Sequence, residues 1–217
     1  MNTHTVARPS LIRSASRWLR SRFERRSDSD GTSQSALDWE AQYAAGKWDF
    51  LTQLSELPRY SVLAGYVCHL GRGGAVLDVG CGQGILLRSL PDAAYSKYVG
   101  IDLSASAIAA AQEHRREPQQ NERSTFLSAD CESYVPGEKF DVIVFNEVLY
   151  YLRDPQQLVK RYAQSLRGGG VMLVSMCTAA RGSAAILGQL KAHYATVAET
   201  LVRDGETRVS WACAVFR

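Results

Sequence analysis

The chain has 217 residues, of which 46% are hydrophobic, enough for one domain of ordinary size with a substantial core. Its five cysteines include no C-x-x-C pair and no Cys/His cluster with metal-ligand spacing, so we expect no disulfide framework, no metal site and a reducing, cytoplasmic location. No uninterrupted apolar run approaches the roughly 18 residues that span a bilayer.

Residues 1–35 are interpreted as a basic arm and a polar linker. Residues 1–26 carry seven arginines against Glu24, a net charge of +6, so the rest of the chain sums to −3. A faintly acidic body is a poor candidate for nucleic-acid binding, and we expect no such partner. Five apolar residues of the arm recur at helical spacing: Leu11, Ala15, Trp18, Leu19 and Phe23. A helix with this face would suit peripheral contact with a membrane or a protein; a loosely docked tail and an organelle transit peptide are the alternatives.

From residue 36 onward, short apolar runs alternate with longer amphipathic stretches. Strands are expected at 75–79, 98–101, 125–128, 140–145 and 171–176. Helices are expected near 52–70, 84–90, 104–115, 155–166 and 183–192, with Ser104 as an N-cap and the glycines at 168–170 ending the fourth helix. Residues 195–202 and 208–216 flank Asp204-Gly205, a hairpin signal.

This alternation predicts an α/β fold over residues 36–217. Strand–helix–strand units give a doubly wound, mostly parallel sheet with both faces covered. The final two segments add an antiparallel hairpin, which makes seven strands in all and is more specific than a plain doubly wound fold.

The stretch VLDVGCGQG at 76–84 places three glycines directly after the first strand. Ligands of open parallel sheets bind beyond the carboxyl ends of the strands, and glycine allows the backbone to approach a ligand closely. Asp102 ends the next strand about 20 residues on, where a carboxylate can bind a ribose diol. Strand, glycine loop, helix, strand and acid together predict a nucleoside site.

The spacing of the loop bears on which nucleoside it binds. The dinucleotide fingerprint G-x-G-x-x-G/A requires a small residue at position 85, which is Ile85. Asp78 lies inside the first strand, where its charge would repel a pyrophosphate and suit a ligand that bears an ammonium group. The pattern therefore disfavours NAD.

These residues resemble the class I S-adenosylmethionine-dependent methyltransferases. Their first motif is similar to VLDVGCGQG and their second to YVGIDLS at 98–104. The resemblance implies a Rossmann-like methyltransferase fold that binds S-adenosyl-L-methionine. Its methionine moiety would pass along four loop residues: Gly80, Cys81, Gly82 and Gly84. Asp78 would orient that moiety, Asp102 would bind the ribose hydroxyls and Leu103 would flank the adenine.

Two further motifs extend the resemblance. SADCESY at 128–134 is similar to the third motif of the family, which implies that Asp130 meets the adenine amino group and Cys131 lines its pocket. FDVIVFNEVLYYL at 140–152 is similar to the fourth, which implies that Asn146 lies beside the cofactor. Within it, EVLYYL resembles the nodulation N-methyltransferases that act on an amino sugar.

Candidates for the chemistry follow the fourth strand and precede the hairpin. Glu147 could act as general base or anchor an acceptor ammonium, and a solvated or capping carboxylate is the alternative. His193 could face the cleft as a second catalytic residue, and a structural or exposed histidine is the alternative. Upstream, Tyr43, Trp48 and Phe50 could form a lid over the cofactor, or could simply pack an extra helix on the sheet.

The function predicted from the sequence is methyl transfer to an oxygen or nitrogen of a small metabolite or saccharide. Alignment of acceptor, methyl and sulfur supplies most of the catalysis, so a dedicated base is optional. Two alternatives remain: a catalytically silent S-adenosylmethionine-binding partner protein and an NAD-dependent oxidoreductase.

Overall fold

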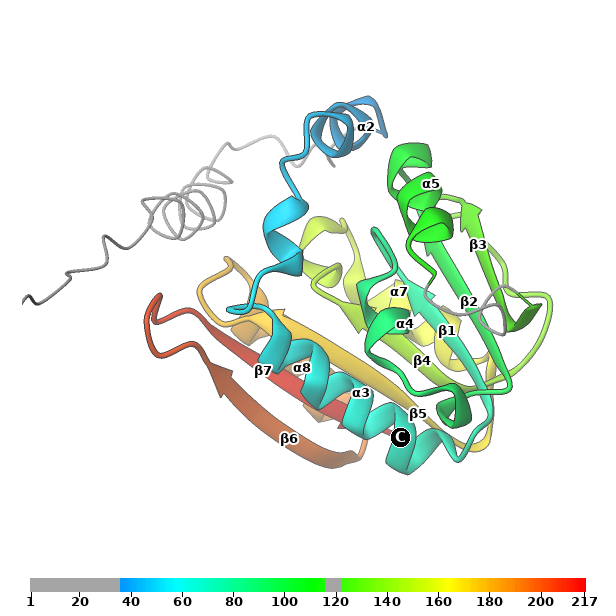
Figure 1. Cartoon of the computed structure of the whole chain (residues 1–217). Coiled ribbons are helices and arrows are strands. Elements are labelled where there is room, and N and C mark those ends of the chain that lie inside the picture. Colours follow the sequence, from blue (N-terminus) through cyan, green and yellow to red (C-terminus); the bar gives the residue numbers. More distant parts are fainter. Residues whose placement is uncertain (1–35, 116–121) are drawn as a thin grey trace, which may run out of the picture.

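The computed structural model describes residues 36–115 and 122–217, and the predicted arm and linker at 1–35 lie outside them. In this part of the chain a central sheet is covered by helices on both faces (Figure 1). None of the described helices is both long and apolar enough to cross a membrane. The division at residue 35 stays a prediction.

The described sheet contains seven strands in the order β3-β2-β1-β4-β5-β7-β6. Their bounds are β1 Ala75–Val79, β2 Lys97–Asp102, β3 Ser124–Ser128, β4 Phe140–Asn146, β5 Leu166–Cys177, β6 Thr196–Arg203 and β7 Ser210–Phe216. Strands β1 to β5 pair in parallel, whereas β7 is antiparallel to both β5 and β6. The predicted mostly parallel sheet with a terminal antiparallel hairpin is confirmed.

The strand order reverses at β1, which lies between β2 and β4. Connections that follow β1 and β4 therefore diverge from neighbouring strand ends, and this is where open α/β sheets bind ligands. The glycine loop after β1 and the residues that follow Asn146 at the end of β4 meet at this point.

Helices form the outer layers. They are α2 Ala36–Ala44, η1 Asp49–Thr52, α3 Leu57–Gly71, α4 Ile85–Ser89, η2 Asp92–Ala94, α5 Ala105–Glu113, η3 Leu149–Tyr151, α7 Pro155–Ala163 and α8 Ser183–His193. The core on one face joins the sheet to α3, α4 and α5, and the core on the other joins it to α7 and α8. All five residues of β1 are buried, as expected for a strand covered on both faces.

Two element boundaries differ from the sequence expectation. The helix expected from residue 52 is replaced by η1 and by α3, which begins at Leu57 with Pro58 in its first turn, where proline is tolerated. The glycines at 168–170 do not end α7, which stops at Ala163; they belong to β5, whose pairing with β4 shifts register there. Gly169 has a φ of +83°, so these glycines serve a bulge.

Two glycines give opposite predictions for stability. A Cβ on Gly100 in β2 would lie 2.6 Å from Phe126 Cδ1 and 2.9 Å from Cys81 Sγ, whereas a Cβ on Gly65 in α3 meets nothing within 4 Å. We expect Gly100→Ala to lower the free energy of unfolding by about 1–3 kcal/mol through overpacking. Gly65→Ala should raise it by about 0.5–1 kcal/mol, because alanine loses less backbone entropy in a helix. Urea unfolding of both variants checks the two signs, and a Gly100→Ala variant as stable as the parent would contradict the packing described.

Candidate functional site

A cavity of about 330 Å³ lies at the carboxyl ends of β1, β2 and β4. This volume is at the lower end of the range for small-molecule sites. The cavity has three parts: the glycine loop with the end of β2, a polar end beside α3 and β4, and an aromatic cover from α2 and η1.

The glycine loop adopts a conformation that side chains rarely allow. Gly80, Gly82 and Gly84 have φ values of +74°, +53° and +69°. The backbone N–H groups of Gly80 and Cys81 both donate to the carbonyl of Ile101, at 2.8 and 2.9 Å, and so fix the loop against β2. Glycine at these positions is required by the left-handed backbone.

Asp102 joins the loop to the end of β2. Its Oδ2 accepts a hydrogen bond from the Gly82 N–H at 2.9 Å, and its Oδ1 accepts one from the Ser104 N–H at 3.0 Å. Each carboxylate oxygen has a second lone pair, so both can also accept from the two hydroxyls of a ribose. Burial raises the pKa of Asp102, although these backbone donors oppose the shift.

Two residues assigned to the cofactor by resemblance lie outside the cavity lining. Asp78 is 1% exposed, accepts from the Tyr98 hydroxyl at 2.5 Å, and has no partner for Oδ1 among the described residues. Burial raises its pKa to about 7. Gly84 allows the loop to pack closely against Phe126, because a Cβ at this position would lie 3.0 Å from that ring. The expected role of Asp78 toward the ammonium group of the cofactor stays a prediction.

The remaining residues assigned to the adenine line the cavity. Leu103, Asp130 and Cys131 form one wall, and Asp130 Oδ1 accepts from the Glu132 N–H at 2.9 Å. Burial raises the pKa of the Cys131 thiol to about 12, so this side chain is neutral and acts as an apolar wall. Their contacts with adenine remain predictions.

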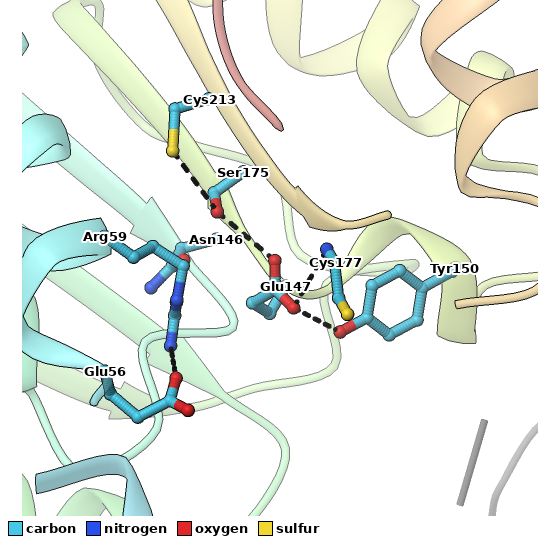
Figure 2. Close-up of polar contacts among 8 residues, drawn as sticks. All are labelled: Glu56, Arg59, Asn146, Glu147, Tyr150, Ser175, Cys177 and Cys213. Carbon is cyan, nitrogen blue, oxygen red and sulfur yellow. Dashed lines mark hydrogen bonds and ion pairs between the residues drawn. The ribbon is translucent and has the colours of Figure 1, made fainter. Parts of the chain in front are cut away.

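The polar end of the cavity is built around a buried arginine (Figure 2). Arg59 is 1% exposed, donates to Glu56 Oε2 at 2.9 Å, and donates through its other terminal nitrogen to Asn146 Oδ1. Its guanidinium lies over Tyr60 and faces Trp211, 4.4 and 5.6 Å from the ring centroids. Burial alone would lower the pKa of Arg59, but the surrounding Tyr60, Glu147 and Glu56 raise it. The group is therefore permanently charged.

Glu147 follows β4 with a φ of +61°, a conformation unusual for glutamate. Its Oε2 accepts from the Tyr150 hydroxyl at 2.8 Å and the Cys177 N–H at 3.2 Å, and its Oε1 accepts from Ser175 Oγ at 3.2 Å (Figure 2). Burial raises its pKa to about 7 against the lowering effect of Arg59 and these hydrogen bonds. The carboxylate lines the cavity and is neither freely solvated nor a helix cap.

Aromatic side chains from α2 and η1 cover the cavity. Trp39 stacks on Trp48 with ring centroids 5.4 Å apart and meets Tyr151 edge-on at 4.9 Å. The Tyr43 hydroxyl lies 2.8 Å from where a Cβ on Gly82 would stand, so it closes directly over the glycine loop. The cavity wall includes the three residues that were expected to form a lid: Tyr43, Trp48 and Phe50.

The structure does not place His193 in the cleft, where it was expected to be a second catalytic residue. It ends α8, is exposed, and has its Nδ1 2.8 Å from the Gln189 carbonyl oxygen. It borders a separate depression between α7 and α8 and does not line the cavity. The α8 helix turns this histidine away from the strand ends, so we assign it no part in the chemistry.

Sequence reasoning missed Glu56, Arg59 and Trp211. A signal existed for Arg59, because it falls on the buried face of α3 together with Tyr60, Leu63, Ala64 and Val67. A charged residue on an apolar helical stripe needs a buried partner. Nothing local in the sequence points to Trp211.

Comparison with known proteins adds to this geometry. A family model described as a methyltransferase domain matches residues 32–208. The ubiquinone biosynthesis O-methyltransferase of Coxiella burnetii (strain RSA 493 / Nine Mile phase I) is 35% identical over 106 residues, 48% of this chain and 44% of that protein. The chain spans less than half the length of such curated relatives.

Two solved structures show the same fold. The N-methyltransferase NodS from Bradyrhizobium japonicum WM9, in complex with S-adenosyl-L-homocysteine, has a TM-score of 0.68 at 21% identity, over 87% of this chain and 98% of that one. The [4+2]-cyclase SpnF has a TM-score of 0.60 at 20% identity, over 73% and 79% of the two chains.

The role of Asp102 can be tested by binding. Asp102→Ala removes the carboxylate that would accept the ribose hydroxyls, so we expect the affinity for S-adenosyl-L-homocysteine to fall by at least ~1–3 kcal/mol. Isothermal titration calorimetry measures this, with Glu113→Ala at the exposed end of α5 as the control. An unchanged affinity in Asp102→Ala would remove the ribose assignment.

The buried carboxyls predict how stability depends on pH. Burial raises the pKa of Asp78 and Glu147 to about 7, whereas such groups titrate near ~4 in an unfolded chain. Between these values the folded state retains protons that the unfolded state has lost, so stability falls as pH rises from about 4 to 7, by up to roughly 4 kcal/mol for each group. Urea unfolding at pH 5 and pH 8 measures the fall. Glu147→Gln should reduce it and Glu113→Gln should not; equal stability of the parent at both pH values would contradict the assignment.

Proposed function

Because the chain belongs to this methyltransferase-domain family, we propose that it transfers the methyl group of S-adenosylmethionine to an oxygen or nitrogen of a small metabolite or saccharide. One observation carries the proposal. The cavity that begins at the glycine loop and Asp102 continues without a break to a carboxylate, Glu147, that can accept a proton. Donor and acceptor would therefore share one enclosed space.

The donor, when bound, supplies an activated methyl on a sulfonium and a good leaving group. The chain must then align the acceptor, exclude water and accept a proton. In the proposed arrangement, Asp102 and the loop hold the nucleoside end, and the amide of Asn146 is fixed by Arg59 between the two halves of the cavity. Glu147 Oε1 or Oε2 takes the proton of the acceptor, and its pKa near 7 suits that task.

Water is excluded by the aromatic cover. Trp39, Tyr43 and Trp48 lie over the cavity, and Glu40 binds α2 to the start of α5 by accepting from the Ser104 hydroxyl at 2.7 Å and from the Ser106 N–H at 3.2 Å. Hydrogen bonds from the Ser106 hydroxyl, the Ser104 hydroxyl and the Ser106 N–H lower the pKa of Glu40, so the contact is present at neutral pH. Small acceptors fit such a closed site better than a macromolecule does.

The names of the relatives are consistent with either oxygen or nitrogen as the methyl acceptor. One is named for O-methylation in ubiquinone biosynthesis and another for N-methylation. The likeness to a [4+2]-cyclase is a reason to test transfer directly, because a shared fold does not fix the activity. A protein that only binds the cofactor is the alternative outcome.

Labelled donor gives the direct test. We expect the full chain, incubated with methyl-tritiated S-adenosylmethionine and a cell extract, to place label in small molecules and not in protein or nucleic acid. Glu147→Gln should lower turnover about 10²–10⁴-fold, as loss of a general base does. Glu113→Gln should leave it unchanged. Tight binding of S-adenosyl-L-homocysteine without any labelled product would instead identify a silent cofactor-binding protein.

A further inference from the structure

We infer that the methyl acceptor is a weakly basic amine that enters as its ammonium form and is held between Glu56 and Glu147. This inference rests on the proposed function and names the acceptor class of the same site. It is carried by the charges that line the cavity and by the bonds that already occupy its arginine.

The cavity wall is strongly acidic. Among the described residues that line it, five carry carboxylates and a single one, Arg59, is a cation. The acids are Glu56, Asp102, Asp130, Glu132 and Glu147. A site with this balance attracts cations and repels acceptors that carry a carboxylate or a phosphate.

Arg59 cannot offset this acidity for an anionic acceptor. Both of its terminal nitrogens are engaged, one with Glu56 and the other with Asn146, and its plane is covered by Tyr60. The remaining Nε is buried away from the cavity surface. The charge of the arginine is therefore already matched by Glu56, and the arginine positions its neighbours.

The two carboxylates at the polar end are placed to hold an ammonium group. Glu56 is 3% exposed and Glu147 is partly buried, and both line the cavity beside Arg59, from α3 and from the end of β4 (Figure 2). Tyr150 and Tyr151 line the same cavity, and aromatic rings can attract cations. Arg59 matches the charge of one of these two acids, so a neutral hydroxyl would leave the polar end with one carboxylate charge unmatched.

The transfer step balances with Glu147 as base. Glu147 takes one proton from R–NH₃⁺ and becomes a carboxylic acid, which leaves a neutral amine with a lone pair. That pair forms the new N–C bond while the C–S bond of the donor breaks and its electrons stay on sulfur, giving R–NH₂⁺–CH₃ and S-adenosyl-L-homocysteine. The acid then loses its proton to solvent. Amines of pKa near 8, such as α-amino groups, match the pKa of Glu147 at about 7.

The experiment compares two halves of one extract, of which one has its amines chemically blocked. One half of a small-molecule extract is treated with N-hydroxysuccinimidyl acetate, which acylates amines, and both halves are incubated with the full chain and trideuteromethyl S-adenosylmethionine. We expect labelled product in the untreated half, at least a tenfold loss in the blocked half, and the label on nitrogen by tandem mass spectrometry. Label that survives blocking, or label on oxygen, overturns the inference and leaves the proposed function standing.

Two variants test the carboxylates on the acceptor so found. Glu56→Gln keeps a carbonyl for Arg59 but removes a charge, and should raise the KM for the amine about tenfold with a smaller change in kcat. Glu147→Gln should mainly lower kcat. Thermal unfolding checks that each variant folds, and Glu113→Gln is the control. An unchanged KM in a folded Glu56→Gln variant overturns the role of Glu56 in binding the amine. If neither half of the extract is labelled although the chain binds S-adenosyl-L-homocysteine, both the inference and the proposed function are overturned.

Discussion

The buried guanidinium of Arg59 is the constraint on which the site depends. A charge that is 1% exposed must be paired, and the pairs that Arg59 makes reach Glu56 at the start of α3 and Asn146 at the end of β4. The start of α3 is thereby tied to the carboxyl end of β4. The cost of burying this charge is offset only while both partners are present, so the polar end of the cavity is rigid before any ligand arrives.

That rigidity has an electrostatic consequence for Glu147. Its carboxyl is kept partly ionisable by Arg59 and by hydrogen bonds from Tyr150 and Ser175, although burial disfavours its charge. The pKa of Asp78 is raised to the same range by burial and by the nearby charge of Asp102, against one hydrogen bond from Tyr98. The fold thus keeps the pKa of two carboxyl groups near 7 at some cost in stability, as is common at functional sites.

Much of the fold and the cofactor half of the site could be predicted, because both are encoded locally. The first strand at 75–79 agrees residue for residue, since a strand buried on both faces is a continuous apolar run. Asp102 could be placed because strand, loop and acid have a fixed spacing. Arg59 has a local signal as a charge on the apolar stripe of α3, but its partner could not be predicted, since its bond to Asn146 joins residues 87 apart and no local pattern records such a pair. The glycines at 168–170 were ambiguous for a related reason: a helix end and a β-bulge both favour glycine.

The aromatic cover shows why the segment before β1 belongs to the site although it lies outside the sheet. The polar attachment of α2 to α5 is made by Glu40, whose carboxylate accepts part-buried hydrogen bonds from Ser104 and Ser106. The stacked rings of Trp39 and Trp48, in contrast, bury apolar area against the cavity mouth and Tyr151. The position of α2 over the cavity therefore depends on both the stacked rings and the hydrogen bonds of Glu40.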